Sequence, residues 1–201
     1  MDYIKAILLG YSLGCINPAY FMGKLKGFDI RSKGSMNPGA SNTLITLGWA
    51  AAVFVGVFDI GKAFCAVKFS ALLCPSLPLA GVIGGAAAVY GHIFPFYLKF
   101  KGGKGFACYM GFILAMDWRA FIAAGLITIA VTWITDYIAL ATLIIVSSFP
   151  LYLYFAGSVP LSFIFAAVGS IPIILKHLVN VKRMIKGEEI GIRKAKKGKI
   201  M

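Results

Sequence analysis

The sequence has few charged residues, and acidic ones are the scarcest. Charged residues make up 13% of the 201 residues, with 7 Asp and Glu against 20 Lys and Arg. A soluble domain usually has about a quarter charged residues, so this chain lacks the charge to cover a water-facing surface. The composition therefore excludes an ordinary soluble domain.

Histidine and cysteine are also scarce, and their spacing does not suit a metal site. His92 and His177 are the two histidines, and the four cysteines form no CxxC pair. Structural zinc needs four grouped ligands, so we expect no metal and buried, unreactive thiols. Neither histidine has an acid five residues later, because Tyr97 and Lys182 stand there. The sequence thus predicts no general-base pair made by the protein alone.

Long apolar stretches dominate what is present. The chain is 60% hydrophobic with a mean hydropathy of +0.86, and one bilayer crossing needs about 20 apolar residues. We predict an all-α integral membrane protein with about seven transmembrane helices, a membrane domain over residues 1–181 and a basic cytoplasmic tail over 182–201. The first stretch has no cleavage site for a signal peptidase, so we expect it to be retained. The predicted stretches are 3–23, 44–73, 79–98, 105–116, 119–135, 138–156 and 159–179. The second is long enough to tilt, to kink or to extend into water, and the fourth is short for a crossing.

The distribution of basic residues predicts the orientation. Lysines and arginines follow the first, third and seventh stretches, whereas Lys5 and Arg119 lie on the other side. The positive-inside rule places the basic side in the cytoplasm, with the N-terminus outside and the C-terminus cytoplasmic. Topology and anionic lipid headgroups then account for the net charge of +13. We expect membrane lipids as partners and no nucleic acid.

Three polar stretches fall on this cytoplasmic side, and the first spans residues 29–42. It contains Ser35, Asn37, Ser41 and Asn42 beside two glycines. Hydroxyl and amide groups in such a loop suit the binding of a polar substrate. A solvated turn is the alternative, because turns use the same residues.

The second polar stretch is the glycine-rich run Lys101–Gly105. Glycines allow backbone N–H groups to approach an anion, and a following helix N-terminus adds positive potential. Lys101 and Lys104 add full charge. It is not a Walker A loop, because Gly105 stands where Ser or Thr would bind magnesium. The run predicts a phosphate site, with a flexible basic turn as the alternative.

The third polar stretch ends the last predicted helix. His177 and Asn180 are three residues apart, so they share a helix face. A binding site is one interpretation, and a hydrogen-bonding helix end at the membrane interface is the other. Asp59 and Lys62 are also one turn apart, within the second apolar stretch, and we expect them to pair.

Together the three stretches resemble the bacterial PlsY-type glycerol-3-phosphate acyltransferases, which use acyl phosphate. The resemblance covers essentially the whole chain. Its most specific parts are the run Phe100–Gly105 and the pattern H-x-x-N-x-x-R-x-x-x-G-x-E from His177 to Glu189. Asp29 to Arg31, followed by the loop to Asn42, fits the first motif of the family.

The resemblance implies transfer of a fatty acyl group from acyl phosphate to the 1-hydroxyl of glycerol 3-phosphate, giving lysophosphatidic acid. It implies a monomer in the bacterial inner membrane, an active site on the cytoplasmic face, and no metal or cofactor. Catalytic roles would fall on Ser35, Lys104, His177 and Asn180. Substrate-binding roles would fall on Arg31, Asn37, Asn42, His92, Lys101, Gly102, Gly103, Gly105, Thr142, Arg183 and Glu189.

The sequence also departs from the family pattern. Ile45 stands where the family usually has an arginine that contacts phosphate, and Leu178 replaces an arginine common after the histidine. Two other functions stay open. One is a divergent paralogue, weakly active or inactive, which Ile45 suggests. The other is a small-anion transporter, for which Asp59, Lys62 and Thr142 within apolar stretches are the evidence.

Overall fold

The computed structural model describes residues 1–189, 191 and 193, and these residues form helices and the connections between them. The longer helices are α1 (Asp2–Cys15), α4 (Trp49–Leu73), α5 (Ala80–Ile93), α6 (Phe106–Met116), α7 (Trp118–Thr135), α8 (Ile138–Phe155) and α9 (Ser162–Ile185). The short ones are α2 (Pro18–Leu25), α3 (Ala40–Leu47) and the 3-10 turns η1 (Ile30–Ser32) and η2 (Phe96–Leu98). The prediction of an all-α chain is confirmed for the described residues. Part of the predicted tail, residues 190, 192 and 194–201, lies outside them.

The first predicted stretch, 3–23, is two helices rather than one. α1 ends at Cys15, and α2 begins at Pro18 with Asn17 as its N-cap. Proline has no N–H to donate and disfavours a helical residue before it. The Asn17 side chain accepts a hydrogen bond from Tyr20 N at 2.9 Å, which is how a cap satisfies an N–H at a helix start. The pair Asn17-Pro18 therefore interrupts the helix and sets a new direction for α2.

The second predicted stretch, 44–73, is also divided. Gly48 has φ +89° and separates α3 from α4, a backbone angle that glycine adopts readily. α4 alone has 25 residues. The expected kink is thus a complete break, and α3 lies outside the long helix.

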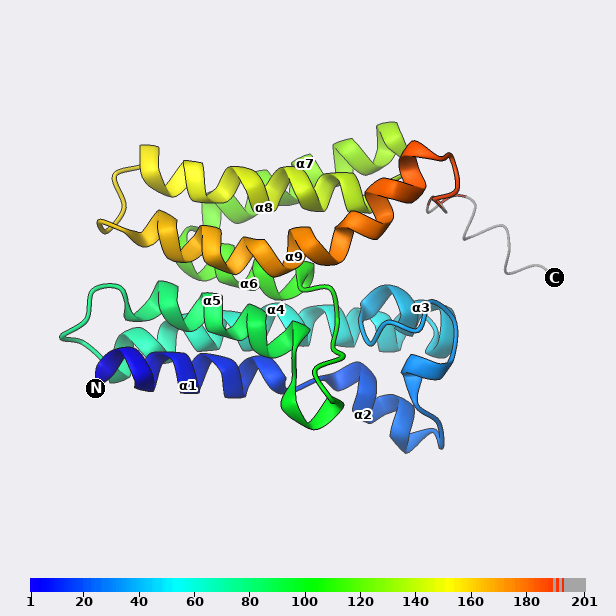
Figure 1. Cartoon of the computed structure of the whole chain (residues 1–201), viewed down its shortest axis with the longest axis horizontal. Helices are drawn as coiled ribbons and strands as arrows, with labels where there is room; N and C mark the ends of the chain where they lie inside the picture. Colours follow the sequence, from blue (N-terminus) through cyan, green and yellow to red (C-terminus); the bar gives the residue numbers. More distant parts are fainter. Residues whose placement is uncertain (190, 192, 194–201) are drawn as a thin grey trace.

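The long helices lie side by side along one axis (Figure 1). In this view α1, α4 and α5 form the lower group, and α7, α8 and α9 form the upper group. α6 lies between them and contacts α4, α5, α7, α8 and α9. The N-terminus is at the left-hand end, whereas α2, α3 and the last turns of α9 are at the right-hand end. We call this right-hand end, together with η1 and the α5–α6 connection, the basic end.

Five described helices are long and apolar enough to cross a membrane, where the sequence predicts about seven. They are α4, α5 extended through η2, α7, α8 and α9. α1 and α6 are shorter, with 14 and 11 residues. α7 faces outward: Ala124 is its one buried residue, while Leu126, Ile129 and Trp133 are exposed. An apolar surface of this extent fits lipid better than water, so the chain is a multi-pass membrane protein.

Small residues bring α1 against α5. A Cβ added to Gly10 would lie 2.2 Å from Gly84 O, and one added to Gly14 would lie 2.1 Å from Ala88 O. Helices in lipid lack a hydrophobic driving force between them, so they gain stability from close backbone approach. Gly10 and Gly14 thus permit a contact that no larger residue allows.

This contact gives a stability prediction. Gly14→Ala places a methyl group against Ala88 O and should lower the free energy of unfolding by about 1–3 kcal/mol. The measurement is the unfolding midpoint in mixed detergent. Gly61→Ala on α4 is the matched control, because a Cβ there meets nothing within 4 Å. Equal losses in the two variants would contradict the packing argument.

Candidate active site

Two buried polar side chains stand one turn apart near the end of α9. His177 and Asn180 are buried, as residues on the inner face of the helix. Nδ1 of His177 lies 2.8 Å from Ile173 O. A carbonyl oxygen only accepts, so Nδ1 carries the hydrogen and Nε2 keeps a lone pair. His177 is therefore held in the tautomer that can accept a proton or a hydrogen bond at Nε2.

Asn180 connects the end of α9 to the glycine-rich stretch. Its Oδ1 accepts a hydrogen bond from Lys104 Nζ at 3.0 Å, and its Nδ2 donates to Glu189 Oε1 at 2.6 Å. An ammonium only donates and a carboxylate only accepts, so these partners orient the amide. We call Lys104, His177, Asn180 and Glu189 the reaction cluster. It joins two of the three predicted polar stretches.

The ammonium of Lys104 is the central cation of the reaction cluster. Burial lowers the pKa of Lys104 from its ordinary value of 10.5, and Arg183 lowers it further, whereas Glu189 opposes the shift. An ammonium has three N–H donors, and one of them goes to Asn180. Among the described residues, Lys104 thus has donors left for an anion that would restore its usual basicity.

The backbone N–H groups of Gly102 and Gly103 have partners other than the anion that the sequence predicts. Gly102 N donates to Ile93 O at 3.0 Å, and Gly103 N donates to His92 O at 3.1 Å. These N–H groups bond the end of α5, so the predicted anion contact through them is wrong. A Cβ on Gly103 would lie 2.1 Å from His92 Nε2, and one on Gly102 would lie 2.1 Å from His92 O. Glycine is needed at both positions because a larger side chain would overlap His92.

Gly105 has a separate role at the start of α6. It is the N-cap residue, with φ +95°, and a Cβ there would meet Ile93 and Ile173 within 3 Å. The first N–H groups of a helix have no partner inside that helix. The first turn of α6, next to Lys104, can therefore supply the backbone donors expected of the glycines.

The first polar stretch is held by its own side chains. Asn42 donates to Ile30 O at 2.9 Å and Lys33 O at 3.0 Å, and it accepts from Ser35 N at 2.7 Å. Asn42 is fully buried, so it braces the loop in place of the expected substrate contact. Ser35 is exposed and Asn37 is half-buried, so these two residues are accessible.

Arg31 also braces this loop. Its Nη2 lies 2.7 Å from Asp29 Oδ2, and its Nη1 donates to Leu98 O at 2.9 Å. The Arg31 guanidinium holds the pKa of Asp29 below its usual value. Arg31 therefore ties the first stretch to η2, and the substrate contact expected of it stays a prediction.

His92 and Thr142 do not meet the reaction cluster. His92 is buried, with Nδ1 3.0 Å from Lys62 Nζ and its Nε2 edge under Gly103. Thr142 is buried, and its hydroxyl donates to Ile138 O at 2.9 Å within α8. Their predicted substrate contacts are thus replaced by contacts inside the protein. Lys101 and Arg183 are exposed.

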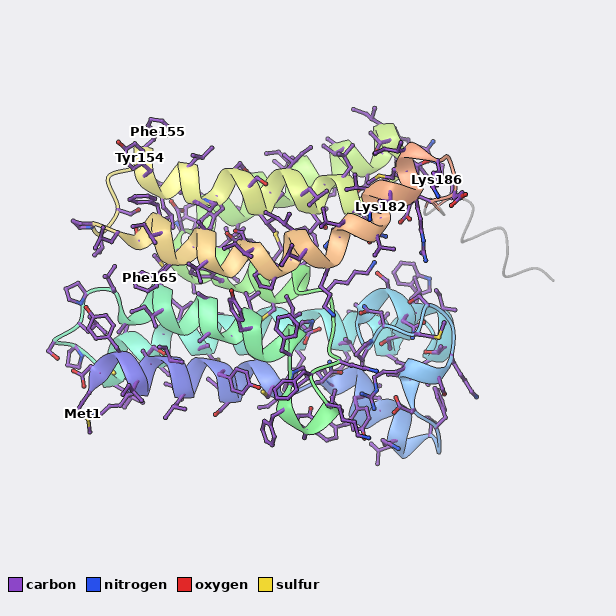
Figure 2. The ribbon with its side chains drawn as sticks, in the orientation of Figure 1. Met1, Tyr154, Phe155, Phe165, Lys182 and Lys186 are labelled. Atoms are coloured by element: carbon purple, nitrogen blue, oxygen red, sulfur yellow. The ribbon has the colours of Figure 1, made fainter. Side chains whose placement is uncertain are left out.

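The structure places the three polar stretches at one end of the bundle. In Figure 1, α3 and the last turns of α9 lie at the right-hand end, and the α5–α6 connection lies to their left, next to the right-hand ends of α1 and α5. Lys182 and Lys186 lie there too, while Met1, Tyr154 and Phe155 lie at the opposite end (Figure 2). Arg31 joins the first stretch to η2, and Lys104 joins the second stretch to Asn180. One common site that includes Ser35 stays a prediction.

Sequence reasoning missed one supporting residue, Asn17. Its Nδ2 donates to Pro38 O at 3.0 Å, so it anchors the first stretch to the break between α1 and α2. Asparagine followed by proline is a known start signal for a helix. That signal was present within the apolar stretch 3–23.

Comparison with known proteins supports one family. The family model described as "Glycerol-3-phosphate acyltransferase" matches residues 4–187. Glycerol-3-phosphate acyltransferase 1 of Oceanobacillus iheyensis is 38% identical, covering 94% of each chain. The glycerol-3-phosphate acyltransferase of Endomicrobium trichonymphae is 37% identical, covering 96% of this chain and 98% of the relative.

Solved structures agree with this assignment. Crystal structures of PlsY (YgiH), an integral membrane glycerol 3-phosphate acyltransferase, are known in a glycerol 3-phosphate form and a lysophosphatidic acid form. The first has a TM-score of 0.88 at 29% identity, covering 96% of both chains, and the second 0.87 at 28%, covering 97% of both. Because the sequence matches span nearly the whole chain and the helices superpose, the chain belongs to the glycerol-3-phosphate acyltransferase family.

Proposed function

We propose that the chain transfers a fatty acyl group from acyl phosphate to the 1-hydroxyl of glycerol 3-phosphate, giving lysophosphatidic acid and phosphate. The observation that carries this proposal is the hydrogen bond from Lys104 to Asn180, one turn from His177. It sets a cation, an oriented amide and an imidazole at one point on the basic end. The forms in which PlsY has been crystallised, with glycerol 3-phosphate and with lysophosphatidic acid, support the substrate and the product.

Acyl phosphate suits a site without a conventional general base. Its carbonyl is already activated by a good leaving group, so positioning and charge stabilisation can supply most of the catalysis. The glycerol hydroxyl attacks the carbonyl carbon, the C–O bond to phosphate breaks, and the hydroxyl proton passes to a phosphate oxygen. Lys104 and the first turn of α6 hold phosphate, and Nε2 of His177 accepts a hydrogen bond at the reacting centre. Ser35 and Asn37 border the same site from the first loop.

For the membrane arrangement we propose seven crossings in a bacterial inner membrane. α1 and α6 would cross with the five longer helices, because both lie along the axis of the bundle. The N-terminus would be outside, and the basic end and the tail would be cytoplasmic, as the positive-inside rule requires. Soluble glycerol 3-phosphate would enter at this face, the acyl chain would lie between helices, and the chain would act as a monomer.

The transporter alternative loses its main support. Asp59 and Lys62 form an ion pair of 2.7 Å with each other, as predicted, and the Thr142 hydroxyl bonds its own helix. These polar groups therefore bind one another or their own helix, and they are no longer evidence for a solute pathway across the membrane.

Lys104 provides the first functional test. Lys104→Ala removes the cation that would hold phosphate, and kcat/KM should fall about 100- to 1,000-fold, as for loss of one preorganised donor. The measurement is phosphate release by purified protein given acyl phosphate and glycerol 3-phosphate. Lys99→Gln removes an exposed lysine from the same connection and should leave the rate unchanged. A fully active Lys104→Ala variant would refute the site.

The pH dependence of the reaction gives a second test. Because burial lowers the pKa of Lys104 below 10.5, the ammonium is lost as pH rises through this lowered value. We expect kcat/KM to fall along an alkaline limb below pH 10.5. A guanidinium stays charged throughout this range, so Lys104→Arg should move the limb to higher pH. An identical limb in both proteins would show that another group titrates.

Ile45 provides a third test. It is 47% exposed and lies close to Gly34, next to Ser35. Ile45→Arg would restore the guanidinium that family members usually carry. A charge-assisted hydrogen bond contributes about 1.5–3 kcal/mol, so KM for glycerol 3-phosphate should fall about 10-fold or more. Ile45→Gln has no charge and should not lower KM. A native protein without turnover that gains it with Ile45→Arg would be the inactive paralogue.

A further inference from the structure

Three titratable side chains lie together outside the reaction cluster. Asp59 and Lys62 on α4 and His92 on α5 are at most 5% exposed. Lys62 Nζ is 2.7 Å from Asp59 Oδ1 and 3.0 Å from His92 Nδ1, and His92 Nδ1 is 3.4 Å from Asp59 Oδ1. None of these groups has a part in the acyl transfer described above.

The contacts settle how the hydrogens are arranged. An ammonium can only donate, so His92 accepts from Lys62 at Nδ1 and carries its own hydrogen at Nε2. Lys62 makes a third contact, a hydrogen bond of 2.6 Å to Ile16 O. Two donors of this ammonium thus go to His92 and Ile16, and the ammonium is also ion-paired with Asp59.

One of these contacts leads to the reaction cluster. His92 lies directly under Gly103, where an added Cβ would lie 2.1 Å from Nε2, and His92 O accepts from Gly103 N. Gly103 immediately precedes Lys104. The His92 ring therefore packs against the residue that precedes the site cation Lys104.

The second contact leads to the first polar stretch. Ile16 precedes Asn17, whose Nδ2 donates to Pro38 O. Pro38 lies between Asn37 and Gly39 in the loop that also contains Ser35. The Lys62 ammonium therefore contacts both Ile16, next to the residue that anchors the first loop, and His92, which packs against the second loop.

We propose that Asp59, Lys62 and His92 are positioning residues that set the distance between the Ser35 loop and Lys104. This inference rests on the proposed function, because the two loops must hold one substrate pair. A buried ion pair is often no more stabilising than apolar residues of the same size. Its donors do fix geometry, and a displacement of about 1 Å at a reacting centre can lower a rate about 100-fold. The contribution of Asp59, Lys62 and His92, which we call the triad, is therefore to position the two loops.

The main variant removes both charges together. In Asp59→Asn combined with Lys62→Met, neither charge of the pair is left buried without its partner. We expect kcat to fall about 100-fold at saturating substrate. Hydrogen–deuterium exchange, which needs no turnover, should be faster in the segments 30–42 and 99–105. Arg31 still joins the first loop to Leu98, which limits the increase in both segments.

A second variant separates the two links. In His92→Asn the amide oxygen keeps an acceptor for Lys62, while the ring edge under Gly103 is lost. Exchange should become faster in 99–105 and stay unchanged in 30–42. Tyr109→Phe is the matched control, because it removes a buried hydrogen bond to Ser170 of 2.8 Å that touches neither loop. The Tyr109→Phe variant should keep the wild-type kcat and the wild-type exchange rates of segments 30–42 and 99–105, even if its unfolding midpoint falls as far as that of His92→Asn.

The outcomes separate this inference from the proposed function. A wild-type protein without acyl transfer refutes the function, while the exchange rates still test whether the triad holds both loops. Unchanged exchange in the double variant, or a loss of kcat no larger than in Tyr109→Phe, overturns the positioning role. Faster exchange in both loops, with the native helical content retained, supports it.

Discussion

In an apolar bundle, backbone N–H and C=O groups have no water to bond, so each has to find a partner inside the protein. The connections at the basic end are shaped by this demand. Gly102 N and Gly103 N bond the last carbonyls of α5, and the Asn42 side chain bonds backbone groups on both sides of the first loop. The Asn17 side chain does the same at the break between α1 and α2. The loops with the polar motifs are therefore tied to helix ends.

This demand determines where anion recognition can occur. Because the N–H groups of Gly102 and Gly103 are used, the proposed phosphate contact rests on Lys104 and on the backbone donors of the first turn of α6. Lys104 is held toward Asn180, which is in turn held by Glu189. The glycines contribute by being small, since a side chain at Gly103 would displace His92. The result is a single cationic group, Lys104, whose position is fixed by Asn180, while Asn180 is oriented by Glu189.

Charge is used in two different ways along the bundle. At the basic end, cations such as Lys182 and Lys186 lie at the surface (Figure 2), where an aqueous phase and lipid headgroups can solvate them. Inside the bundle, Lys62 and Asp59 pair, and Lys62 also contacts His92. A charge in apolar surroundings needs such partners. The outer cations are the basis of the proposed membrane orientation, whereas the inner group is proposed to position the two loops.

The sequence by itself determined the membrane class, the basic segments and the pairing of Asp59 with Lys62. Each of these follows from local composition, from helical spacing or from a motif, because hydropathy and charge are properties of short segments. Only the tertiary structure decided that Gly102 and Gly103 donate to α5, that Asn42 and Arg31 brace a loop, and that His92 joins Lys62. The reason is that a hydrogen bond is assigned by which groups meet in space. The partners of Lys62, at Ile16 and His92, are 46 and 30 residues away along the chain, and helix packing alone brings them together.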